Sequence, residues 1–230
     1  MGIIEEIIKR RRPSLIVLAN VHTLNIAYED MSYKQILRNA RVIFRDGAGV
    51  EWALKKRGIP GLHNFCGTDF IPDFCKFTAS KKYRYYLLGS KPDVCRVAAE
   101  KLDALAPGII VSGYHHGYFP HEQTAEIVDR INKSRCDVLL VAMGNPKQEC
   151  WIWDNLDRLT VPACIGVGAL FDYLSGAVRR APPWMLRARM EWIFRLITEP
   201  RRLWKRYLVG NPKFIIRNHN ELRAMRCGGS

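Results

Sequence analysis

The chain has 230 residues, of which 48% are apolar and 25% charged, and its formal net charge is +14. This composition is that of an ordinary globular protein and excludes a disordered or collagen-like chain. No stretch approaches the roughly 20 consecutive apolar residues that a membrane-spanning helix needs. Glu5 and Glu6 stand where a signal peptide would be basic, so we expect a cytosolic chain. Seven cysteines without a C-x-x-C spacing predict reduced thiols rather than disulfides or a zinc site.

The positive charge is unevenly distributed along the chain. Residues 179–226 hold 13 Lys and Arg against three Glu, whereas the preceding 178 residues hold 23 basic and 19 acidic side chains. This asymmetry predicts a nearly neutral body over residues 1–178 and a strongly basic appendage over residues 179–226.

The body alternates short, continuously apolar runs with stretches of helical length. Six strands are expected at residues 15–19, 42–44, 84–88, 109–111, 137–143 and 162–167, and helices between them include 93–106, 122–133 and 146–156. Strands without polar alternation are typical of a parallel sheet that is covered on both faces. The sequence therefore predicts an α/β, Rossmann-like fold with a mostly parallel sheet and helices on both faces, followed by a basic helical appendage.

Glycines and polar residues follow each expected strand. In chain order they are Asn20, Asp46 with Gly47, Gly89 with Ser90, the run 115–119, the run 144–149 and the run 166–172. The connections after parallel strands meet at the carboxyl edge of the sheet, where such folds bind ligands. We therefore expect the functional site at this edge.

Some of these connections are suited to a phosphorylated ligand. The turn Gly144-Asn145-Pro146 predicts a helix that begins with Asn145 as N-cap, so that free backbone N–H groups and Lys147 face an anion. Gly166 and Gly168 would let a ligand approach the backbone, although tight turns alone would also explain these glycines. The sequence lacks the G-x-G-x-x-G, P-loop and D-x-D patterns, so NAD, P-loop ATP and metal-bridged diphosphate chemistry are not expected.

Eight short motifs together resemble one known family. They are DGAGV (46–50), GTD (67–69), GYHHGYF (113–119), AMGNPKQE (142–149), GVGALFD (166–172), VRRAP (178–182), EWIFRL (191–196) and EPRR (199–202). In this order and spacing the chain is similar to the bacterial TagA/WecG/CpsF glycosyltransferases of teichoic acid, enterobacterial common antigen and capsule synthesis. The resemblance covers nearly the whole chain.

The resemblance implies an inverting hexosyltransferase that needs neither a metal ion nor another cofactor. Such an enzyme moves N-acetylmannosamine, its uronic acid or glucose from a UDP-sugar to a polyprenyl-diphosphate-linked saccharide, as a peripheral protein on the cytoplasmic face of the plasma membrane. Inversion requires a base for the acceptor hydroxyl. Asp46 matches the family's candidate base, with Glu149 and Asp69 as weaker rivals and helix capping as the alternative interpretation.

The same matching assigns further residues. Gln148 and Asn20 would contact the donor sugar or diphosphate, Tyr118 would face the uracil ring, and Asp172 would accept a hydrogen bond from that base. The expected donor site is completed by Gly47, Gly89, Gly144, Lys147, Gly166 and Gly168.

Other positions are less clear or depart from the family. His115 and His116 are adjacent and lack a third ligand, so no metal site is expected. Many relatives carry Thr at the position of Leu18 and a basic residue at that of Asn64. These departures leave the exact donor and acceptor open.

The basic appendage indicates binding to an anionic membrane surface. Residues 184–198 are expected to form one helix, and in residues 201–209 basic and apolar side chains are expected on opposite helical faces. The basic face holds Arg201, Arg202, Lys205 and Arg206, and the apolar face holds Leu203, Trp204, Tyr207 and Leu208. The resemblance implies that arginines of the appendage, Arg195 among them, reach the acceptor diphosphate.

Three alternatives stay open for the appendage. It can be an ordinary helix that packs on the body with a solvated basic face. The chain can also be a nucleic-acid- or membrane-binding protein without catalysis, although the large apolar residues argue against nucleic acid as a partner. Exposed apolar surface would also allow the chain to form a homo-oligomer.

Overall fold

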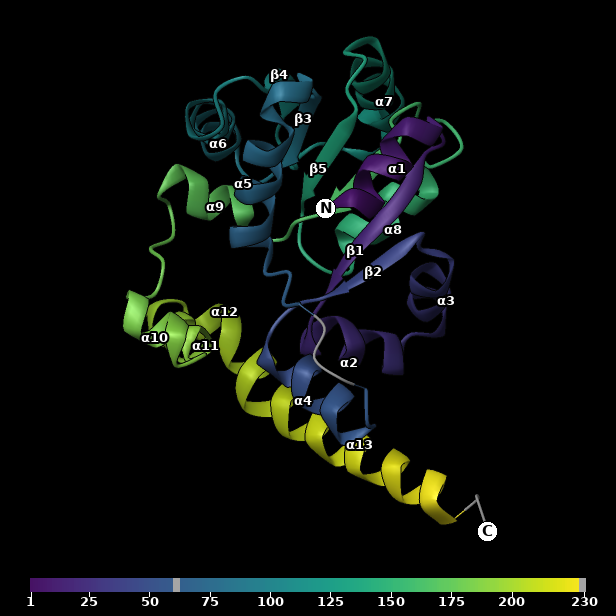
Figure 1. The fold of residues 1–230 in the computed structure, drawn as a ribbon, viewed down its shortest axis with the longest axis vertical. Coiled ribbons are helices and arrows are strands. Elements are labelled where there is room, and N and C mark those ends of the chain that lie inside the picture. Colours follow the sequence, from purple (N-terminus) through teal and green to yellow (C-terminus); the bar gives the residue numbers. More distant parts are fainter. Residues whose placement is uncertain (60–62, 228–230) are drawn as a thin grey trace.

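The computed structural model describes residues 1–59 and 63–227 and shows an α/β fold with an appended helical segment (Figure 1). Six strands form one sheet in the order β2-β1-β6-β5-β3-β4, and every neighbouring pair is parallel. The strands are β1 (Ser14–Ala19), β2 (Val42–Arg45), β3 (Arg84–Gly89), β4 (Ile110–His115), β5 (Val138–Ala142) and β6 (Ala163–Gly166). The predicted α/β class and the helix-covered sheet are confirmed, and the sheet is fully parallel.

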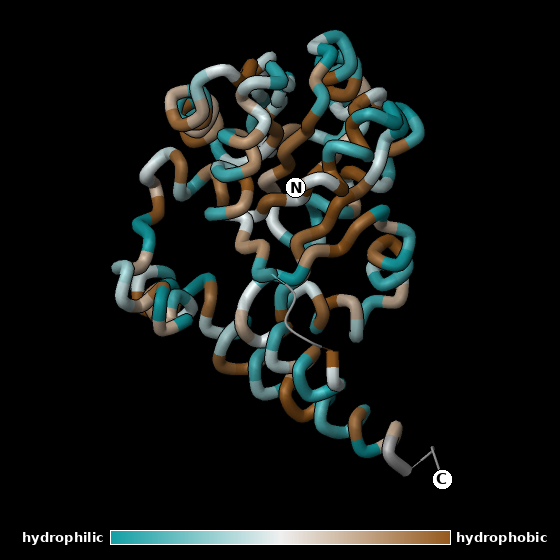
Figure 2. Tube along the Cα trace, in the orientation of Figure 1, coloured by the Kyte–Doolittle hydropathy of each residue, from teal (hydrophilic) through white to brown (hydrophobic). Residues whose placement is uncertain are grey.

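Alternate residues of the central strands point to opposite faces of the sheet, and each face carries its own layer of helices. One face is covered by α1 (Gly2–Arg10), α5 (Gly67–Thr78), α6 (Pro92–Leu105) and α9 (Leu170–Ser175). The other is covered by α2 (Val21–Glu29), α3 (Met31–Asn39), α7 (Thr124–Lys133) and α8 (Lys147–Asp154). Figure 2 shows the strands as the hydrophobic centre of the molecule. Burial on both faces explains why the strands have no polar alternation.

The strand order brings the functional connections together. The register pairs Ala19 with Arg45, Val17 and Val141 with Gly166, and Gly89 with Ala142. The residues that follow β1, β2, β3, β5 and β6 therefore emerge along one edge of the sheet. Helix α4 (Ala48–Lys56) begins there directly after β2.

The appendage consists of short helices and one long helix. They are α10 (Pro183–Arg187), α11 (Glu191–Thr198), α12 (Pro200–Trp204), one turn of π-helix (Lys205–Val209) and α13 (Gly210–Cys227). Two short 3-10 turns in the body, Ala79–Lys81 and His121–Gln123, complete the helical elements of the described chain. No helix within the described ranges combines the length and the apolar character needed to cross a membrane.

Helix α13 packs on the body beneath α2 and α4 (Figure 1). The amide of Asn25 donates to the carbonyl oxygen of Gly210 at 2.7 Å. Arg217 pairs with Glu29 at 2.6 Å and lies over the ring of Tyr28. A hydrogen bond and an ion pair thus hold the C-terminal helix against α2.

The structure corrects three local predictions. The expected helix 184–198 is two helices, because Arg189 adopts a left-handed conformation with φ of 59° between α10 and α11. The fourth strand extends to His115, so that Gly113 and Tyr114 belong to the sheet rather than to the loop. Helix α8 begins after Pro146, so Asn145 is not its N-cap.

Candidate active site

Asp46 lies at the carboxyl edge of the sheet, directly after β2. Its backbone N–H donates to the carbonyl oxygen of Ala19, which continues the β1–β2 ladder by one residue. Gly47 follows with φ of 89°, and its N–H donates to Oδ1 of Asn64 at 2.8 Å. Asn64, where the family usually has a basic residue, therefore holds the loop that carries Asp46.

Asn20 fixes the position of the Asp46 carboxylate from the end of β1. Its side-chain oxygen accepts hydrogen bonds from the N–H groups of His22 and Thr23, which makes Asn20 the N-cap of α2. The amide nitrogen is thereby turned toward Asp46, with 3.5 Å between Nδ2 and Oδ2. The structure brings these two predicted site residues together.

The surroundings of Asp46 make it a stronger base than an exposed aspartate. The pKa of its carboxyl group is raised to about 6, mainly by desolvation with a smaller contribution from Glu191, while Asn20, Arg206 and Cys66 act in the opposite direction. A carboxylate with this pKa is ionised at neutral pH and accepts a proton more readily than one with an ordinary pKa. Asp46 therefore has the accessibility and the basicity of a general base.

Arg206 of the π-helical turn reaches the same edge. It is half-buried, and its charge acts on both Asp46 and His22. Burial, followed by the charge of Arg206, lowers the pKa of His22 to about 4, so His22 is neutral at pH 7. The appendage therefore places a cation beside the candidate base.

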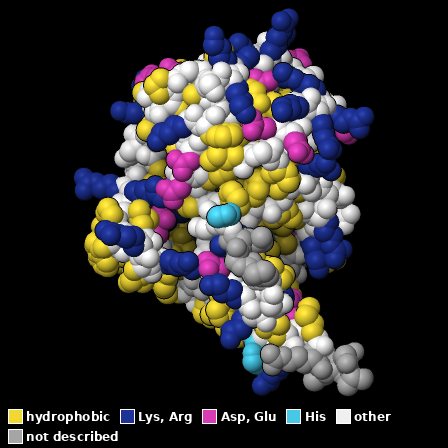
Figure 3. Space-filling view, in the orientation of Figure 1, with side chains coloured by type: hydrophobic (Ala, Val, Ile, Leu, Met, Phe, Trp, Pro, Cys, Tyr) yellow, Lys and Arg dark blue, Asp and Glu magenta, His cyan; other side chains and the backbone are white. Residues whose placement is uncertain are grey.

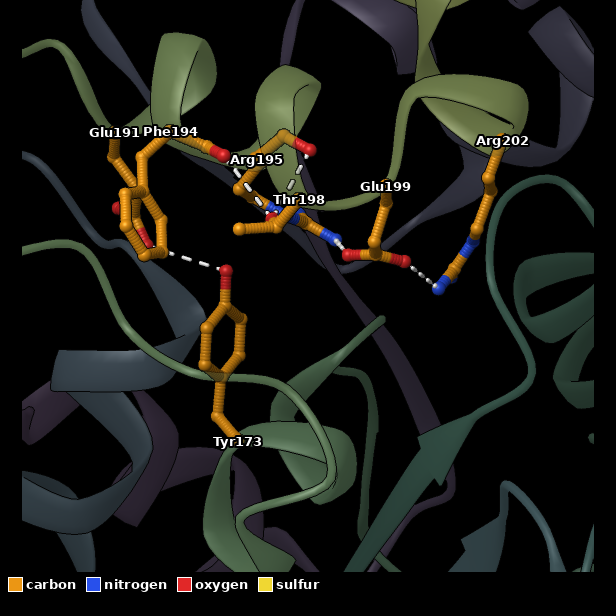
Figure 4. A network of polar contacts seen from close by, with 7 residues as sticks. All are labelled: Tyr173, Glu191, Phe194, Arg195, Thr198, Glu199 and Arg202. Carbon is orange, nitrogen blue, oxygen red and sulfur yellow. Dashed lines mark hydrogen bonds and ion pairs between the residues drawn. The ribbon is translucent and has the colours of Figure 1, made fainter.

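A second set of appendage residues contacts the body through α9 (Figure 4). The hydroxyl group of Tyr173 donates to Glu191 at 3.4 Å, and the guanidinium of Arg195 lies over the Tyr173 ring. Glu199 bridges Arg195 at 3.4 Å and Arg202 at 2.7 Å through its two oxygens. Arg195 is largely buried, and its Nε has no hydrogen-bond partner within the described chain.

Burial does not follow the predicted division of residues 201–209 into a basic and an apolar face. Arg206 faces the body, whereas Arg201, Arg202 and Lys205 are exposed. Leu203 is buried and Tyr207 packs on Trp192, whereas Trp204 and Leu208 are 45% and 58% exposed. Leu203, Arg206 and Tyr207 are spaced three and four residues apart, so they share one side of the helix, and that side is the less exposed one.

Two glycines of the predicted donor site make room for protein atoms instead of a ligand. A Cβ on Gly89 would lie 2.4 Å from the carbonyl oxygen of Ala142 on the neighbouring strand. A Cβ on Gly166 would lie 2.6 Å from Nε2 of Gln148. The expectation that the backbone at Gly166 is open to a ligand is therefore wrong.

The backbone N–H groups of Gly144, after β5, and of Gly168, after β6, are also occupied. Gly144 and Gly168 both donate to Oε1 of Gln148, at 3.1 and 3.0 Å. Gln148 is 2% exposed, so in this structure it ties two loops together rather than facing the open edge. Lys147 is exposed next to it and carries the charge that was expected there.

The remaining donor-side residues lie farther along the edge. Asp172 is half-buried at the start of α9 and accepts a hydrogen bond from Ser90 at 2.8 Å. Tyr118 is 69% exposed, and its N–H donates to His116. Within the described ranges, no three His, Cys, Asp or Glu side chains form a group that could hold a metal ion.

Burial and ion pairing distinguish the two rival bases from Asp46. Glu149 is completely buried, and Asp69 forms an ion pair with Arg180 at 2.5 Å. Sequence reasoning did not single out His22, Cys66, Tyr173 or Glu191. Glu191 stands in the EWIFRL motif, which was the available signal, whereas contacts between the appendage and the body leave no pattern in one sequence.

Comparison with known proteins gives consistent matches over nearly the whole chain. Residues 1–227 match the sequence model of the glycosyl transferase WecG/TagA/CpsF family. Similar proteins from Bacillus spizizenii, Bacillus subtilis and Staphylococcus aureus are each named N-acetylglucosaminyldiphosphoundecaprenol N-acetyl-beta-D-mannosaminyltransferase. The first is 32% identical over 90% of this chain and 79% of its own length, and the second 32% over 83% and 73%. The third is 31% identical over 87% and 76%. With its Asp46 site at the carboxyl edge of a parallel sheet, this chain belongs to the WecG/TagA/CpsF family of glycosyl transferases.

Proposed function

We propose that the chain transfers N-acetylmannosamine from its UDP derivative to N-acetylglucosaminyl-diphosphoundecaprenol, with inversion and without a metal ion. The names of the three relatives support this sugar and this acceptor, while the UDP donor is what the family resemblance implies. The observation that carries the proposal is that Asp46, partly exposed and with a raised pKa, is contacted by Asn20 and feels the charge of Arg206 from the appendage.

In this reaction Asp46 removes the proton of the acceptor hydroxyl group. The hydroxyl oxygen forms the new bond to the anomeric carbon as the bond from that carbon to the diphosphate oxygen breaks, and UDP leaves with the electron pair. Asn20 holds the carboxylate through its amide nitrogen. Arg206 supplies positive charge beside this site, which favours a diphosphate on the appendage side.

The appendage also supports attachment to a membrane surface. Figure 3 shows apolar side chains gathered over α10–α12, with Lys and Arg side chains beside them. The exposed apolar residues of this segment and of the start of α13 are Trp184, Trp192, Ile197, Trp204, Leu208, Val209, Ile215 and Ile216. Aromatic and aliphatic side chains bordered by cations suit the interface of an anionic bilayer. We infer that the enzyme meets its lipid-linked acceptor as a peripheral protein on the cytoplasmic membrane face.

Calorimetric titration with UDP, ADP and GDP, each with and without EDTA, tests the donor. We expect binding that is selective for UDP and unchanged by EDTA. Equal binding of all three nucleotides would contradict the proposal that the donor is a UDP-sugar. Loss of UDP binding in EDTA would contradict the proposal that no metal ion is needed. Transfer from UDP-N-acetylmannosamine to a short-chain prenyl-diphosphate-N-acetylglucosamine, compared with UDP-glucose, then tests the sugar.

A further inference from the structure

Glu149 is a completely buried carboxylate just behind the donor edge. It lies in the first turn of α8, after β5, and has no exposed surface. Tyr33 donates to its Oε2 at 3.0 Å, and Asn145 and Gln148 donate to its Oε1 at 2.8 and 2.7 Å. A buried carboxylate is tolerated when donors of this kind surround it. Glu149 therefore has a fixed position but no route to a substrate.

Gln148 connects the fixed carboxylate of Glu149 to two loops through hydrogen bonds. Because its amide nitrogen donates to Glu149, its amide oxygen must point the other way. That oxygen accepts the N–H groups of Gly144 and Gly168, which lie in the loops after the neighbouring strands β5 and β6. One side chain thus sets the relative position of both loops.

Glycines in the two loops leave space for the side chains of Gln148 and Glu149. A Cβ on Gly166 would lie 2.8 Å from Oε1 of Glu149 and even closer to the amide of Gln148. Gly144 and Gly168 have φ of 79° and 57°, a region that glycine adopts readily. The chain therefore contains three glycines whose geometry fits the Gln148–Glu149 pair.

We propose that Glu149 is a positioning residue of the donor site, which acts through Gln148 to hold the loops after β5 and β6 in their binding geometry. The inference rests on the proposed function, because it takes this edge as the site of the UDP-sugar. It gives Gln148 a positioning role behind the site in place of direct contact with the donor.

The test compares Glu149→Ala and Glu149→Gln with the wild-type chain. Glu149→Ala leaves three donors without an acceptor and frees the amide of Gln148 to turn, so we expect the Kd for UDP to rise about tenfold or more. The KM of the lipid-linked acceptor should change less than twofold. Glu149→Gln keeps an oxygen that can accept from Asn145 and Gln148, and should bind UDP within about twofold of wild type.

Asp137→Asn is the matched control at the opposite end of β5. Asp137 is also a buried carboxylate, and it accepts from Arg11 at 2.6 Å and from the N–H of Arg84 at 2.9 Å. This variant should lower Tm yet leave the Kd for UDP unchanged. An equal loss of UDP affinity in both variants would show that Glu149 acts only through global stability and would overturn the proposal.

Two further measurements keep the outcome decisive. If Glu149→Ala does not fold, Gly166→Ala displaces the Gln148–Glu149 pair without removing a polar group, and a wild-type Kd in that variant would overturn the proposal. Amide hydrogen exchange at Gly144 and Gly168 should accelerate in the Glu149 or Gly166 variant but not in Asp137→Asn. Absence of UDP binding by the wild-type chain would refute the donor site itself, whereas normal wild-type binding with unaffected variants would refute only the role of Glu149.

Discussion

At the scale of single residues, Asp46 combines two properties that rarely coincide at a protein surface. The residue is partly exposed, which a substrate hydroxyl requires, and yet desolvation raises the pKa of its carboxyl group to about 6. Groups facing it come from the N-cap of α2 (Asn20), the N-cap of α5 (Cys66), α11 (Glu191) and the π-helical turn (Arg206). Two of these four groups belong to the appendage, and their charges act on the pKa of Asp46 in opposite directions.

We expect kcat/KM to fall as the pH decreases through about 6, because protonation of Asp46 removes the base. Above that pH the carboxylate is ionised and the rate should reach a plateau. Asp46→Asn should lose at least about a hundredfold in kcat, while its Kd for UDP stays within about twofold of wild type. Asp69→Asn, in the ion pair with Arg180, serves as the control carboxylate. Wild-type turnover in Asp46→Asn would show that another group is the base.

Several single-residue features could be predicted from the sequence, and others could not. Asn20 and Asp46 were predictable because each follows an apolar strand, and parallel strands bring their carboxyl ends together. For Gly89 and Gly166 the sequence shows only that a side chain is missing. What fills the space, a neighbouring strand in one case and Gln148 in the other, follows from tertiary packing.

At the scale of elements, the body follows its sequence pattern more closely than the appendage does. Continuous apolar runs indicate where the strands lie, and the four central strands are buried on two faces, which leaves no polar alternation. In the appendage, the break at Arg189 is accompanied by an ion pair between Arg189 and Glu51 at 2.7 Å. The partners are separated by 138 positions, so no local pattern reveals the break.

The exposed apolar side chains of the appendage lead to a prediction for membrane binding. Trp204 and Leu208 are exposed and contribute apolar area that a bilayer interface would cover. The double variant Trp204→Ala and Leu208→Ala should lower partitioning into anionic vesicles by about tenfold or more, with an unchanged Kd for UDP. The control is Tyr114→Ala with Ile110→Ala on the edge strand β4, which are similarly exposed but distant in the fold. Equal partitioning of the two double variants would contradict docking through the appendage.

At the scale of the whole molecule, the boundary between the nearly neutral and the strongly basic part of the sequence coincides with the boundary between the body and the appendage. The strongly basic residues 179–226 form the appendage, and the nearly neutral body carries the sheet. The body and the appendage are nevertheless not independent of each other. Leu203 is buried, the charge of Arg206 acts on the pKa of Asp46, and Arg217 pairs with Glu29. Both parts therefore contribute to the edge that we propose to be catalytic.

This charge distribution predicts how membrane binding depends on salt. Retention on vesicles with anionic lipid should fall steeply between roughly 0.05 and 0.5 M salt, because the charges are increasingly screened over that range. Vesicles of zwitterionic lipid should retain much less protein at low salt. Duplex DNA of equal charge is the competitor: displacement of the protein from vesicles by DNA would support a nucleic-acid partner instead.

The turn of π-helix at Lys205–Val209 determines the rotational phase between the two ends of the C-terminal helix. Each residue of an α-helix advances the side-chain direction by about 100°, and a π-turn accommodates one residue more than a regular turn. Winding the same residues as a regular α-helix would therefore rotate everything before the turn by about that angle relative to α13. Arg206 could then no longer face the body while Arg217 stays on Glu29. The length of this turn, to a single residue, therefore decides whether one continuous helix can serve the catalytic edge and its own docking surface together.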